Sequence, residues 1–543
     1  MEQLHVSGNA PSAVDLLITG GTLIDGSGVG GRPGAVGVSE GRLLLGEAGW
    51  RPLAGRTIDA TGLAVAPGFI DLHSHGGLVI LADPRHEPKV RQGVTTEVIG
   101  VDGNGYAPFA RHEDLLAFVE MNSGLDGHPE IAYDWDSMAS YITRYDQGQA
   151  VYIAIMVANS ALRIGAIGWE DRPADARAIA SMRAMLREGL EEGAFGVSTG
   201  LDYPPGSFAS TDELAELTNE AARLGGFYHT HVRYPLGDRF LDPFREAIEI
   251  GRRGEGPVHL THFYHRQTHP GGPEQLLSLV DDARRGGRDV TFDSYPYEWA
   301  STRLLIQLPQ WVQSGGPKAL KERLADRSVR DRLRGEMATR GPAYSGPAGW
   351  ADLRLGAFTR PENLHWESGT LADVMDETGS DAVDAICELL LSENLAVAQV
   401  SSGPWSETLP HFIRHPVGMI GTDSTFLGEK PSPRTYGSFP RILGQFVRDE
   451  HLLTLEEAVR KMTSAPAARL GLTDRGLLRD GFAADLVVFD PVRVRSNATY
   501  DEPRRYPDGI EHVMVNGELV VDGGAHTGAL PGRALRRGRN LNS

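Results

Sequence analysis

The stretch "APGFIDLHSHGG", residues 66–77, places His73 and His75 at the end of an apolar run and directly before a glycine pair. The apolar run predicts a buried β-strand over residues 69–75. Side chains alternate between the two faces of a strand, so His73 and His75 point to the same side. Two neutral imidazoles that converge at a strand end form a natural metal chelate, with a hydrogen-bonded structural pair as the alternative.

Further apolar runs along the chain follow the same pattern, and helix-like segments separate several of them. Residues 176–193 and 210–226 are clear helical segments, and the second opens on a Ser/Thr cap. Strands that alternate with helices predict an α/β protein, a (β/α)8 TIM-like barrel with its chemistry at the C-terminal strand ends. The eight predicted strands are residues 69–75, 95–100, 151–158, 193–200, 227–233, 258–263, 290–297 and 417–424.

The chain divides into three predicted regions. Residues 66–302 and 417–475 form the metal-dependent barrel. The segment 303–416 is too long for an ordinary connection between strands seven and eight, so it predicts a helical insertion that serves as a lid. Stretches within residues 1–65 and 476–543 alternate apolar and polar side chains and carry turn glycines, as hairpin strands do. The two ends are expected to pair into one small β-sandwich.

Composition and charge exclude several classes of function. Hydrophobic residues make up 41% of the 543 residues without a long uncharged apolar run, so no membrane span is expected. The net charge of −19 argues against nucleic acid or a membrane as partner and leaves a small molecule. The first residues lack the features of a signal peptide, and the single cysteine, Cys387, allows no disulfide within the chain. These features predict a cytoplasmic protein, and its oligomeric state stays open.

Three more metal-binding or acid/base candidates lie near the ends of predicted strands. His231 belongs to the strand 227–233, and His262 to the strand 258–263. Asp423 closes the last predicted strand in "IGTDS". Because the C-terminal ends of barrel strands meet at one face, these side chains are expected to gather with His73 and His75.

The other histidines near the strands are weaker ligand candidates. His229 lies one pleat deeper than His231 and is expected to line the site without binding metal. His259 comes three residues before His262, so it is expected to point to the opposite face. His265 and His269 fall in the following loop and could touch substrate. His411 and His415 lie before the last predicted strand and are expected to be structural.

These features together resemble the amidohydrolase superfamily: HxH on strand one, single histidines on strands five and six, and an aspartate on strand eight. Within it, "GAFGVSTGLDYPPG", "FDSYPYEWAST" and "SPRTYGSFPRILG" are similar to the N-acyl-D-amino-acid deacylase (D-aminoacylase) family. The stretches "LTLEEAVRKMTSAPAARLGLTDRG" and "GFAADLVVFDP" resemble it too, and the similarity covers residues 14–536. The resemblance implies a sandwich-plus-barrel fold, zinc, and hydrolysis of an amide.

The resemblance also implies roles for individual residues. His73 and His75 match the more weakly occupied metal site of the family, and His231 and His262 match histidines of the tightly bound zinc. One or two Zn²⁺ ions are therefore expected. Asp423 matches the catalytic acid/base, and the residues that match a grip on the substrate carboxylate are Tyr295, Ser301 and Arg434.

The sequence departs from the family pattern after strand two. Asp102 stands where the family has a zinc-binding cysteine. A carboxylate can ligate zinc, but it is a harder ligand than a thiolate and can admit another divalent metal. The alternative is that Asp102 only caps a turn before Gly103.

A second departure follows His262, because Tyr264 stands where the family has a lysine that helps to bind the substrate carboxylate. Arg434 could still hold a carboxylate through its guanidinium fork, and Arg233 could help. A milder change is Asn159, where relatives usually have a histidine. Together these changes predict an altered substrate with a retained reaction.

The sequence thus predicts metal-assisted amide hydrolysis, in which Asp423 takes a proton from water and later delivers it to the departing nitrogen. One alternative is a hydrolase or cyclase acting on a cyclic amide such as a hydantoin or lactam, because a ring amide needs no free carboxylate. Another is a catalytically inactive scaffold, which the retained histidines and Asp423 disfavour. The acyl group, the stereochemistry and the number of metals stay open.

Overall fold

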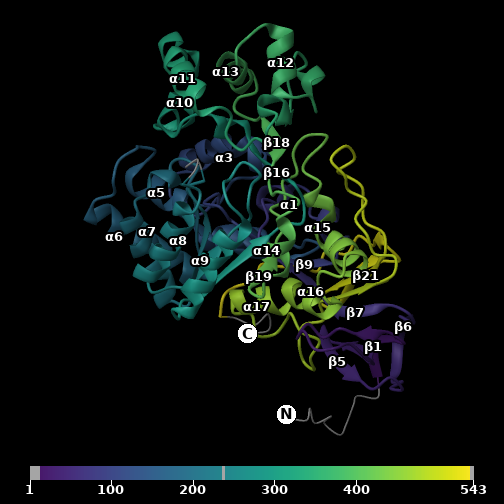
Figure 1. The fold of residues 1–543 in the computed structure, drawn as a ribbon. Coiled ribbons are helices and arrows are strands. Elements are labelled where there is room, and N and C mark those ends of the chain that lie inside the picture. Colours follow the sequence, from purple (N-terminus) through teal and green to yellow (C-terminus); the bar gives the residue numbers. More distant parts are fainter. Residues whose placement is uncertain (1–12, 235–238, 539–543) are drawn as a thin grey trace.

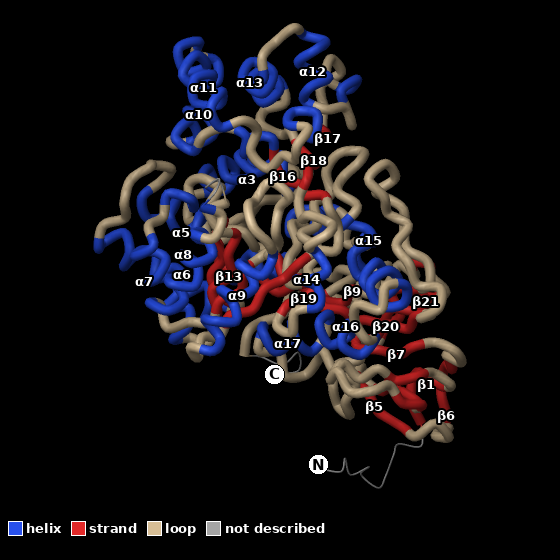
Figure 2. The backbone as a smooth tube through the Cα atoms, viewed as in Figure 1, coloured by secondary structure: helices blue, strands red, loops and turns tan. Residues whose placement is uncertain are grey.

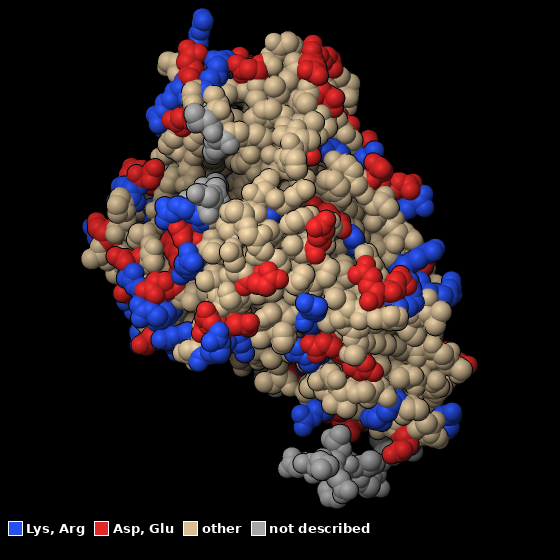
Figure 3. All heavy atoms as spheres, in the orientation of Figure 1, with Lys and Arg blue, Asp and Glu red and all other residues tan. Residues whose placement is uncertain are grey.

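The computed structural model describes residues 13–234 and 239–538. Residues 1–12, on which the expectation about a signal peptide partly rests, lie outside the described residues, as do the last five residues of the predicted sandwich. Within the described ranges, every helix is either too short or too polar to cross a membrane. Acidic and basic side chains are interspersed on the face shown in Figure 3.

Parallel strands and intervening helices form the centre of the molecule, with β13 and β19 near the middle of Figure 2 and helices outside them. One sheet has the order β10-β9-β8, another β11-β12-β13-β14-β15-β19, and neighbours in both are parallel. The strands are β8 (Phe69–Asp71), β9 (Val94–Ile99), β10 (Tyr152–Ile155), β11 (Val157–Ala158), β12 (Gly196–Gly200), β13 (Phe227–His231), β14 (Val258–Leu260), β15 (Val290–Ser294) and β19 (Gly418–Ile420).

The segments that follow β8 and β19 also pair with each other. Ser74 and Ser424 form a parallel bridge. The Asp423 N–H donates to the His73 carbonyl at 2.8 Å, and the His75 N–H donates to the Ser424 carbonyl at 3.0 Å. The first predicted strand therefore meets the last one at the point where the candidate ligands lie.

The predicted helical segments are helices in the structure. Helix α6 (Ala176–Glu192) begins after Asp175, whose side chain accepts a hydrogen bond from the Ala178 N–H. Helix α7 (Thr211–Arg223) begins after Ser210, which caps the Glu213 N–H in the same way. In α6 the buried residues recur at helical spacing, so one face of this polar helix packs into the protein.

The two ends of the chain meet in the sheets at the lower right of Figure 1. Strand β7 (Ala64–Pro67) pairs antiparallel with β20 (Leu486–Phe489), within the order β23-β22-β21-β20-β7-β2-β3. A second sheet has the order β5-β4-β1-β6. Leu16, Val36, Leu486 and Met514 belong to one apolar cluster, so both ends contribute to a shared core. The other strands are β1 (Ala13–Thr19), β2 (Thr22–Leu23), β3 (Arg32–Pro33), β4 (Ala35–Ser39), β5 (Arg42–Gly46), β6 (Leu53–Asp59), β21 (Ile510–Val515), β22 (Glu518–Asp522) and β23 (Ala525–His526).

The segment before β19 forms a separate group of helices at the top of Figure 1, with its own apolar cluster around Leu320, Ile386 and Cys387. It also contains an antiparallel sheet of order β16-β18-β17, which the expectation of a helical insertion did not include. These strands are short and far apart in the sequence, so no local pattern links them. The elements are β16 (Trp299–Arg303), α10 (Gly316–Ala325), α11 (Arg327–Arg340), β17 (Arg354–Gly356), α12 (Leu371–Thr378), α13 (Ala382–Ser392) and β18 (Ala398–Ser402).

Candidate active site

His73 and His75 lie beyond the end of β8, where the chain runs beside the segment after β19. Both side chains still reach the same place, as the alternation of an extended chain requires. The His73 Nε2 atom lies 3.4 Å from Asp423 Oδ1, and so does the His75 Nε2 atom. Both imidazoles are almost fully buried.

Asp102 lies at the centre of the predicted histidines. Its left-handed backbone (φ 51°) precedes Gly103 (φ 67°), where an added Cβ would meet the Gly200 nitrogen at 2.6 Å. The close turn therefore directs the Asp102 carboxylate into the cluster. Its Oδ2 atom lies 3.2 Å from His73 Nε2, 3.8 Å from His75 Nε2, 3.5 Å from His231 Nδ1 and 3.3 Å from His262 Nε2.

Each of these imidazoles uses its second nitrogen to contact a further buried group. Such contacts fix the ring orientation and the tautomer of a metal ligand. Sequence reasoning missed these partners because they are not part of the histidine pattern. The pairs are His73 Nδ1 with Asp293 Oδ1 at 3.4 Å, His75 Nδ1 with Asp126 Oδ1 at 2.9 Å, His231 Nε2 with Asp202 Oδ2 at 2.9 Å, and His262 Nδ1 with the Tyr234 hydroxyl at 2.9 Å.

The buried carboxylates favour positive charge at this place. Burial alone would lower the pKa of His73, but Asp102, Asp423 and Asp293 raise that pKa to about 10. Burial also opposes the charge of His231, but hydrogen bonds with Asp102 and Asp202 raise its pKa to about 9. His262 differs, because burial holds its pKa below the usual value although Asp102 acts to raise it. Carboxylates that stabilise protonated His73 and His231 would also favour a bound cation.

The donor set fits one or two divalent metal ions. His73, His75, Asp102 and Asp423 offer ligand atoms within 4.8 Å of one another, and so do Asp102, His231 and His262. Zinc ligands at about 2.0–2.1 Å in a tetrahedral arrangement lie about 3.3 Å from each other. The shortest contacts of Asp102 Oδ2, at 3.2 and 3.3 Å, match that spacing. Asp102 belongs to both groups, so its carboxylate could serve as a ligand in either.

The two carboxylate oxygens of Asp423 have different neighbours. Oδ1 faces the histidine cluster, and Oδ2 faces Arg434. The Arg434 Nη1 atom lies 2.7 Å from Asp423 Oδ2, and both side chains are buried. Burial alone would raise the pKa of the Asp423 carboxyl, but Arg434 and His73 hold it below its usual value. Arg434 Nη2 also donates to the Ser301 carbonyl at 3.1 Å, so this arginine fixes the carboxylate.

The cluster opens into a cavity lined by Tyr264, Tyr295 and Ser301. These three residues were predicted to contact substrate, and the structure places them beside the cluster of histidines and aspartates. The hydroxyl of Tyr295 is buried and has no hydrogen-bond partner among the described residues, so it is free to donate to a ligand. Asp102, His231 and Asp423 line the same cavity.

The two arginines among the predicted substrate contacts, Arg434 and Arg233, do not line this cavity, and Arg434 is held by Asp423. The Arg233 Nε atom lies 3.0 Å from Glu246 Oε2, and the Arg233 Nη atoms donate to the carbonyls of Ser207 and Ala209. The Arg233 guanidinium is therefore occupied within the protein.

His229 and His259 lie together beneath His73. Their rings stack with centroids 5.2 Å apart, and His259 Nε2 lies 3.0 Å from Asp293 Oδ2. The prediction that His259 points to the opposite face is wrong. Strand β14 ends before His262, whose left-handed backbone (φ 32°) breaks the alternation on which that prediction depends.

Residues 56–362 and 371–521 match the family model described as "Amidohydrolase family". The chain belongs to the amidohydrolase family. The resemblance inferred from the sequence is thereby confirmed.

Curated relatives from Alcaligenes xylosoxydans xylosoxydans align with almost the whole of this amidohydrolase. N-acyl-D-aspartate deacylase is 33% identical over 542 residues, which cover 98% of this chain and 96% of the relative. D-aminoacylase is 34% identical over 529 residues, which cover 96% of this chain and 98% of the relative.

Solved structures agree with this assignment to the amidohydrolases. N-acyl-D-glutamate deacylase from Bordetella bronchiseptica, complexed with zinc and a phosphonate inhibitor that mimics the tetrahedral intermediate, has a TM-score of 0.81 and 31% identity. The match covers 96% of this chain and all of that one. D-hydantoinase has a TM-score of 0.54 at 14% identity, a likeness of fold alone.

Proposed function

We propose that this amidohydrolase cleaves the amide bond of N-acyl-D-amino acids, with Asp423 as general base and then general acid. The observation that carries the proposal is the convergence of His73, His75, His231 and His262 on Asp102, with Asp423 beside them. The relatives support it, since their names describe deacylases of N-acyl-D-aspartate and N-acyl-D-glutamate and a D-aminoacylase. The D configuration is taken from those relatives.

We propose that the histidines and Asp102 hold one or two divalent metal ions, with Zn²⁺ as the first candidate. A bound zinc ion polarises a carbonyl and lowers the pKa of water from 15.7 to about 7. The zinc in the related deacylase structure supports this identity. Asp102 is a harder ligand than the cysteine of the family, so another divalent metal remains an alternative.

The residues around the cavity would transfer the proton, orient the catalytic carboxylate and bind the substrate. Asp423 Oδ1 accepts a proton from the attacking water and delivers it to the amide nitrogen, which leaves as an amine. Arg434 keeps the carboxylate ionised and oriented through its 2.7 Å contact. The unpartnered Tyr295 hydroxyl donates to a substrate oxygen, and Ser301 and Tyr264 complete the substrate wall. A contact of Arg233 with substrate stays a prediction, which its pairing with Glu246 does not favour.

We infer that the parallel strands from β8 to β19 close into the predicted (β/α)8 barrel. The Ser74–Ser424 bridge and the Asp423–His73 hydrogen bond support closure. The shared apolar cluster of both chain ends supports the β-sandwich. The helical group over residues 303–416 would act as the lid. A cytoplasmic location stays a prediction, consistent with the buried free thiol of Cys387.

Cyclic amides are the weaker substrate class. The hydantoinase structures are only 13–15% identical to this chain, whereas the linear deacylases exceed 30%. An inactive scaffold is weaker still, because the complete set of imidazoles and Asp423 is retained in one place.

The test is a comparison of substrates with purified, zinc-loaded protein and its Asp423→Asn variant. We expect release of free amino acid from N-acetyl-D-amino acids, little from the L enantiomers, and none from hydantoins or lactams. Asp423→Asn should keep its metal and lose at least about 100-fold in kcat, because proton transfer contributes 10²–10⁴-fold. A variant that turns over at the wild-type rate contradicts the role of Asp423.

A further inference from the structure

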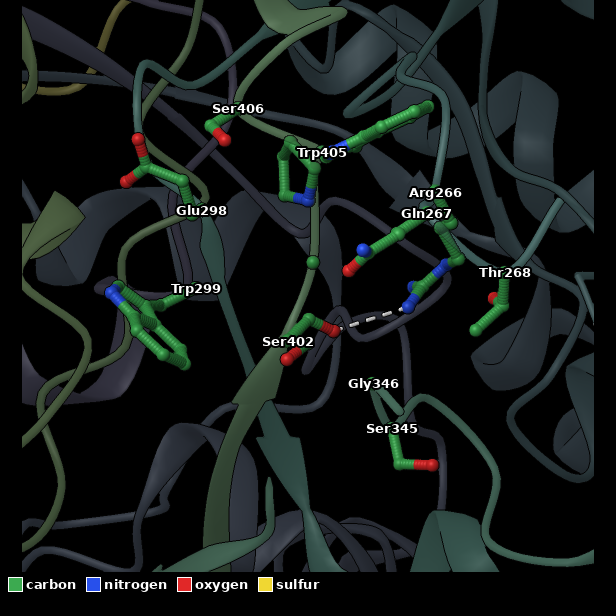
Figure 4. A pocket seen from close by; sticks show the side chains of 12 residues that line it. Arg266, Gln267, Thr268, Glu298, Trp299, Ser345, Gly346, Ser402, Trp405 and Ser406 are labelled. Atoms are coloured by element: carbon green, nitrogen blue, oxygen red, sulfur yellow. Dashed lines mark hydrogen bonds between the residues drawn. The ribbon is translucent and has the colours of Figure 1, made fainter. Parts of the chain in front are cut away.

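Arg266 lies where two cavities meet. One is the inner cavity that contains Asp102, His231 and Asp423. The other is an outer cavity of about 120 Å³, shown in Figure 4, whose walls include Trp299 and Trp405. Arg266 lines both, and Ser402 stands beside it on the outer side. A ligand in either cavity would therefore lie beside Arg266.

The Arg266 side chain is held in place rather than free to swing. Its Nη2 donates to the Tyr264 hydroxyl at 2.7 Å, and its Nη1 donates to the Ser402 carbonyl at 3.2 Å, the dashed line in Figure 4. The guanidinium also lies over the Tyr344 ring, 4.9 Å from its centroid. Only 7% of the residue is exposed. Such fixation preorganises the cation for a ligand.

Arg266 has no carboxylate partner within residues 13–234 and 239–538, whereas Arg434 and Arg233 each have one. Arg434 pairs with Asp423, and Arg233 pairs with Glu246. Glu298 lines the outer cavity, but it pairs with Arg441 at 2.9 Å. A guanidinium carries five N–H donors, and a buried cation without a counter-ion is costly. Among the described residues, therefore, no carboxylate neutralises this guanidinium, and an anionic ligand would do so.

We propose that Arg266 binds a carboxylate of the substrate and so determines specificity for N-acyl amino acids over neutral amides. The inference rests on the proposed function. Tyr264, which stands where the resemblance places a lysine, accepts a hydrogen bond from Arg266 and so holds the Arg266 guanidinium at the cavity wall. A guanidinium fork suits a carboxylate, either the α-carboxylate or the side-chain carboxylate of an acidic amino acid.

The first test measures binding without turnover, in the Asp423→Asn background loaded with zinc. Calorimetry compares N-acetyl-D-leucine, N-acetyl-D-aspartate and the neutral N-acetyl-D-leucinamide. Arg266→Met should raise the Kd of a carboxylate ligand about 10- to 100-fold, as expected for a lost hydrogen-bonded charge. The Kd of the neutral amide should change less than about 2-fold.

The three ligands also identify which carboxylate is bound. An equal loss for both acids assigns Arg266 to the α-carboxylate. A loss confined to N-acetyl-D-aspartate assigns it to the side-chain carboxylate. Equal weakening of the amide and the acids, or no weakening of either acid, overturns the proposal.

Two further variants control the experiment. Arg266→Lys keeps the charge but not the fork, so it should recover part of the lost affinity. Arg252→Met removes an exposed arginine that pairs only with Glu249 among the described residues, and it should bind all three ligands as the parent does. Thermal unfolding and metal content show whether Arg266→Met is folded and loaded.

Kinetics in the wild-type background separate this proposal from the proposed function. If the wild type deacylates N-acyl amino acids and Arg266→Met leaves the KM unchanged, Arg266 is wrongly assigned and the function stands. If the wild type deacylates none of them while binding still depends on Arg266, the function fails and the anion site stands.

Discussion

Asp102 is the residue on which the metal proposal depends most, because one of its oxygens contacts His73, His75, His231 and His262. We expect Asp102→Ala to lose metal from both histidine pairs, whereas Asp102→Cys should retain metal and prefer zinc over manganese. Metal analysis after dialysis against equal zinc and manganese measures this.

An exposed carboxylate provides the control for Asp102. Asp282 pairs only with its neighbour Arg285 among the described residues, so Asp282→Ala should keep the wild-type metal content. If Asp102→Ala also keeps it, Asp102 is no ligand and only shapes the turn before Gly103.

The four histidines and Asp423 could be predicted because each closes an apolar run, and parallel strands bring such ends together. The groups that contact the second nitrogen of these imidazoles could not be predicted in this way, because Asp126, Asp202 and Tyr234 lie outside the strand pattern. Asp293 was within reach of sequence reasoning, since it lies in the predicted strand 290–297 as the second residue of "FDSYPY". Arg266 follows "HFYH" in a loop without a pattern, so only its position between two cavities marks it.

Strands β8 and β9 are joined to the segment after β19 by Lys89 of helix α2 (Glu87–Val90). The fully buried Lys89 ammonium contacts Asp71 and lies 3.1 Å from Glu97 Oε1 and 2.6 Å from the Thr422 hydroxyl. Lys89→Met would leave buried carboxylates without their cation. We expect it to lower the free energy of unfolding by about 3–5 kcal/mol, measured by urea denaturation.

A matched variant on the surface tests whether burial is the cause. Lys321 contacts Glu120 with a third of its side chain exposed. Lys321→Met should cost at most about 1 kcal/mol. If both variants lose a similar free energy of unfolding, burial of the Lys89 network does not explain its contribution to stability.

At the scale of elements the predicted strands are right in place, but five of the eight extend more than one residue beyond the observed C-terminal end, namely those at β8, β13, β14, β15 and β19. The chain leaves regular pairing before Asp423 and before His262, and both residues have a left-handed backbone (φ 47° and 32°). Apolar character continues past the last ladder hydrogen bond, so a pattern of hydrophobicity cannot show where pairing ends. The antiparallel sheet of the insertion was missed because its pairing is set by tertiary contacts.

For the whole molecule, removal of metal should lower thermal stability. The cluster would then rely on protons in place of the metal to balance its buried carboxylates. With free zinc about 1,000-fold above its Kd, binding would add about 4 kcal/mol. Differential scanning calorimetry of chelated and zinc-restored protein should show a lower Tm for the chelated form.

The double variant Asp102→Ala/His231→Ala separates loss of metal from direct effects of the chelator. It should unfold at one temperature with and without zinc. If the wild type behaves the same way, the cluster holds no ion that matters for folding.

The pairing of β7 with β20 has a consequence for synthesis on the ribosome. The partners are more than 400 residues apart, from Pro67 to Leu486. At about 5–20 residues per second, β7 leaves the exit tunnel roughly 20–80 s before β20 exists. Its open edge is exposed to other nascent chains in that interval, so premature termination before β20 should yield aggregates rather than a smaller folded protein.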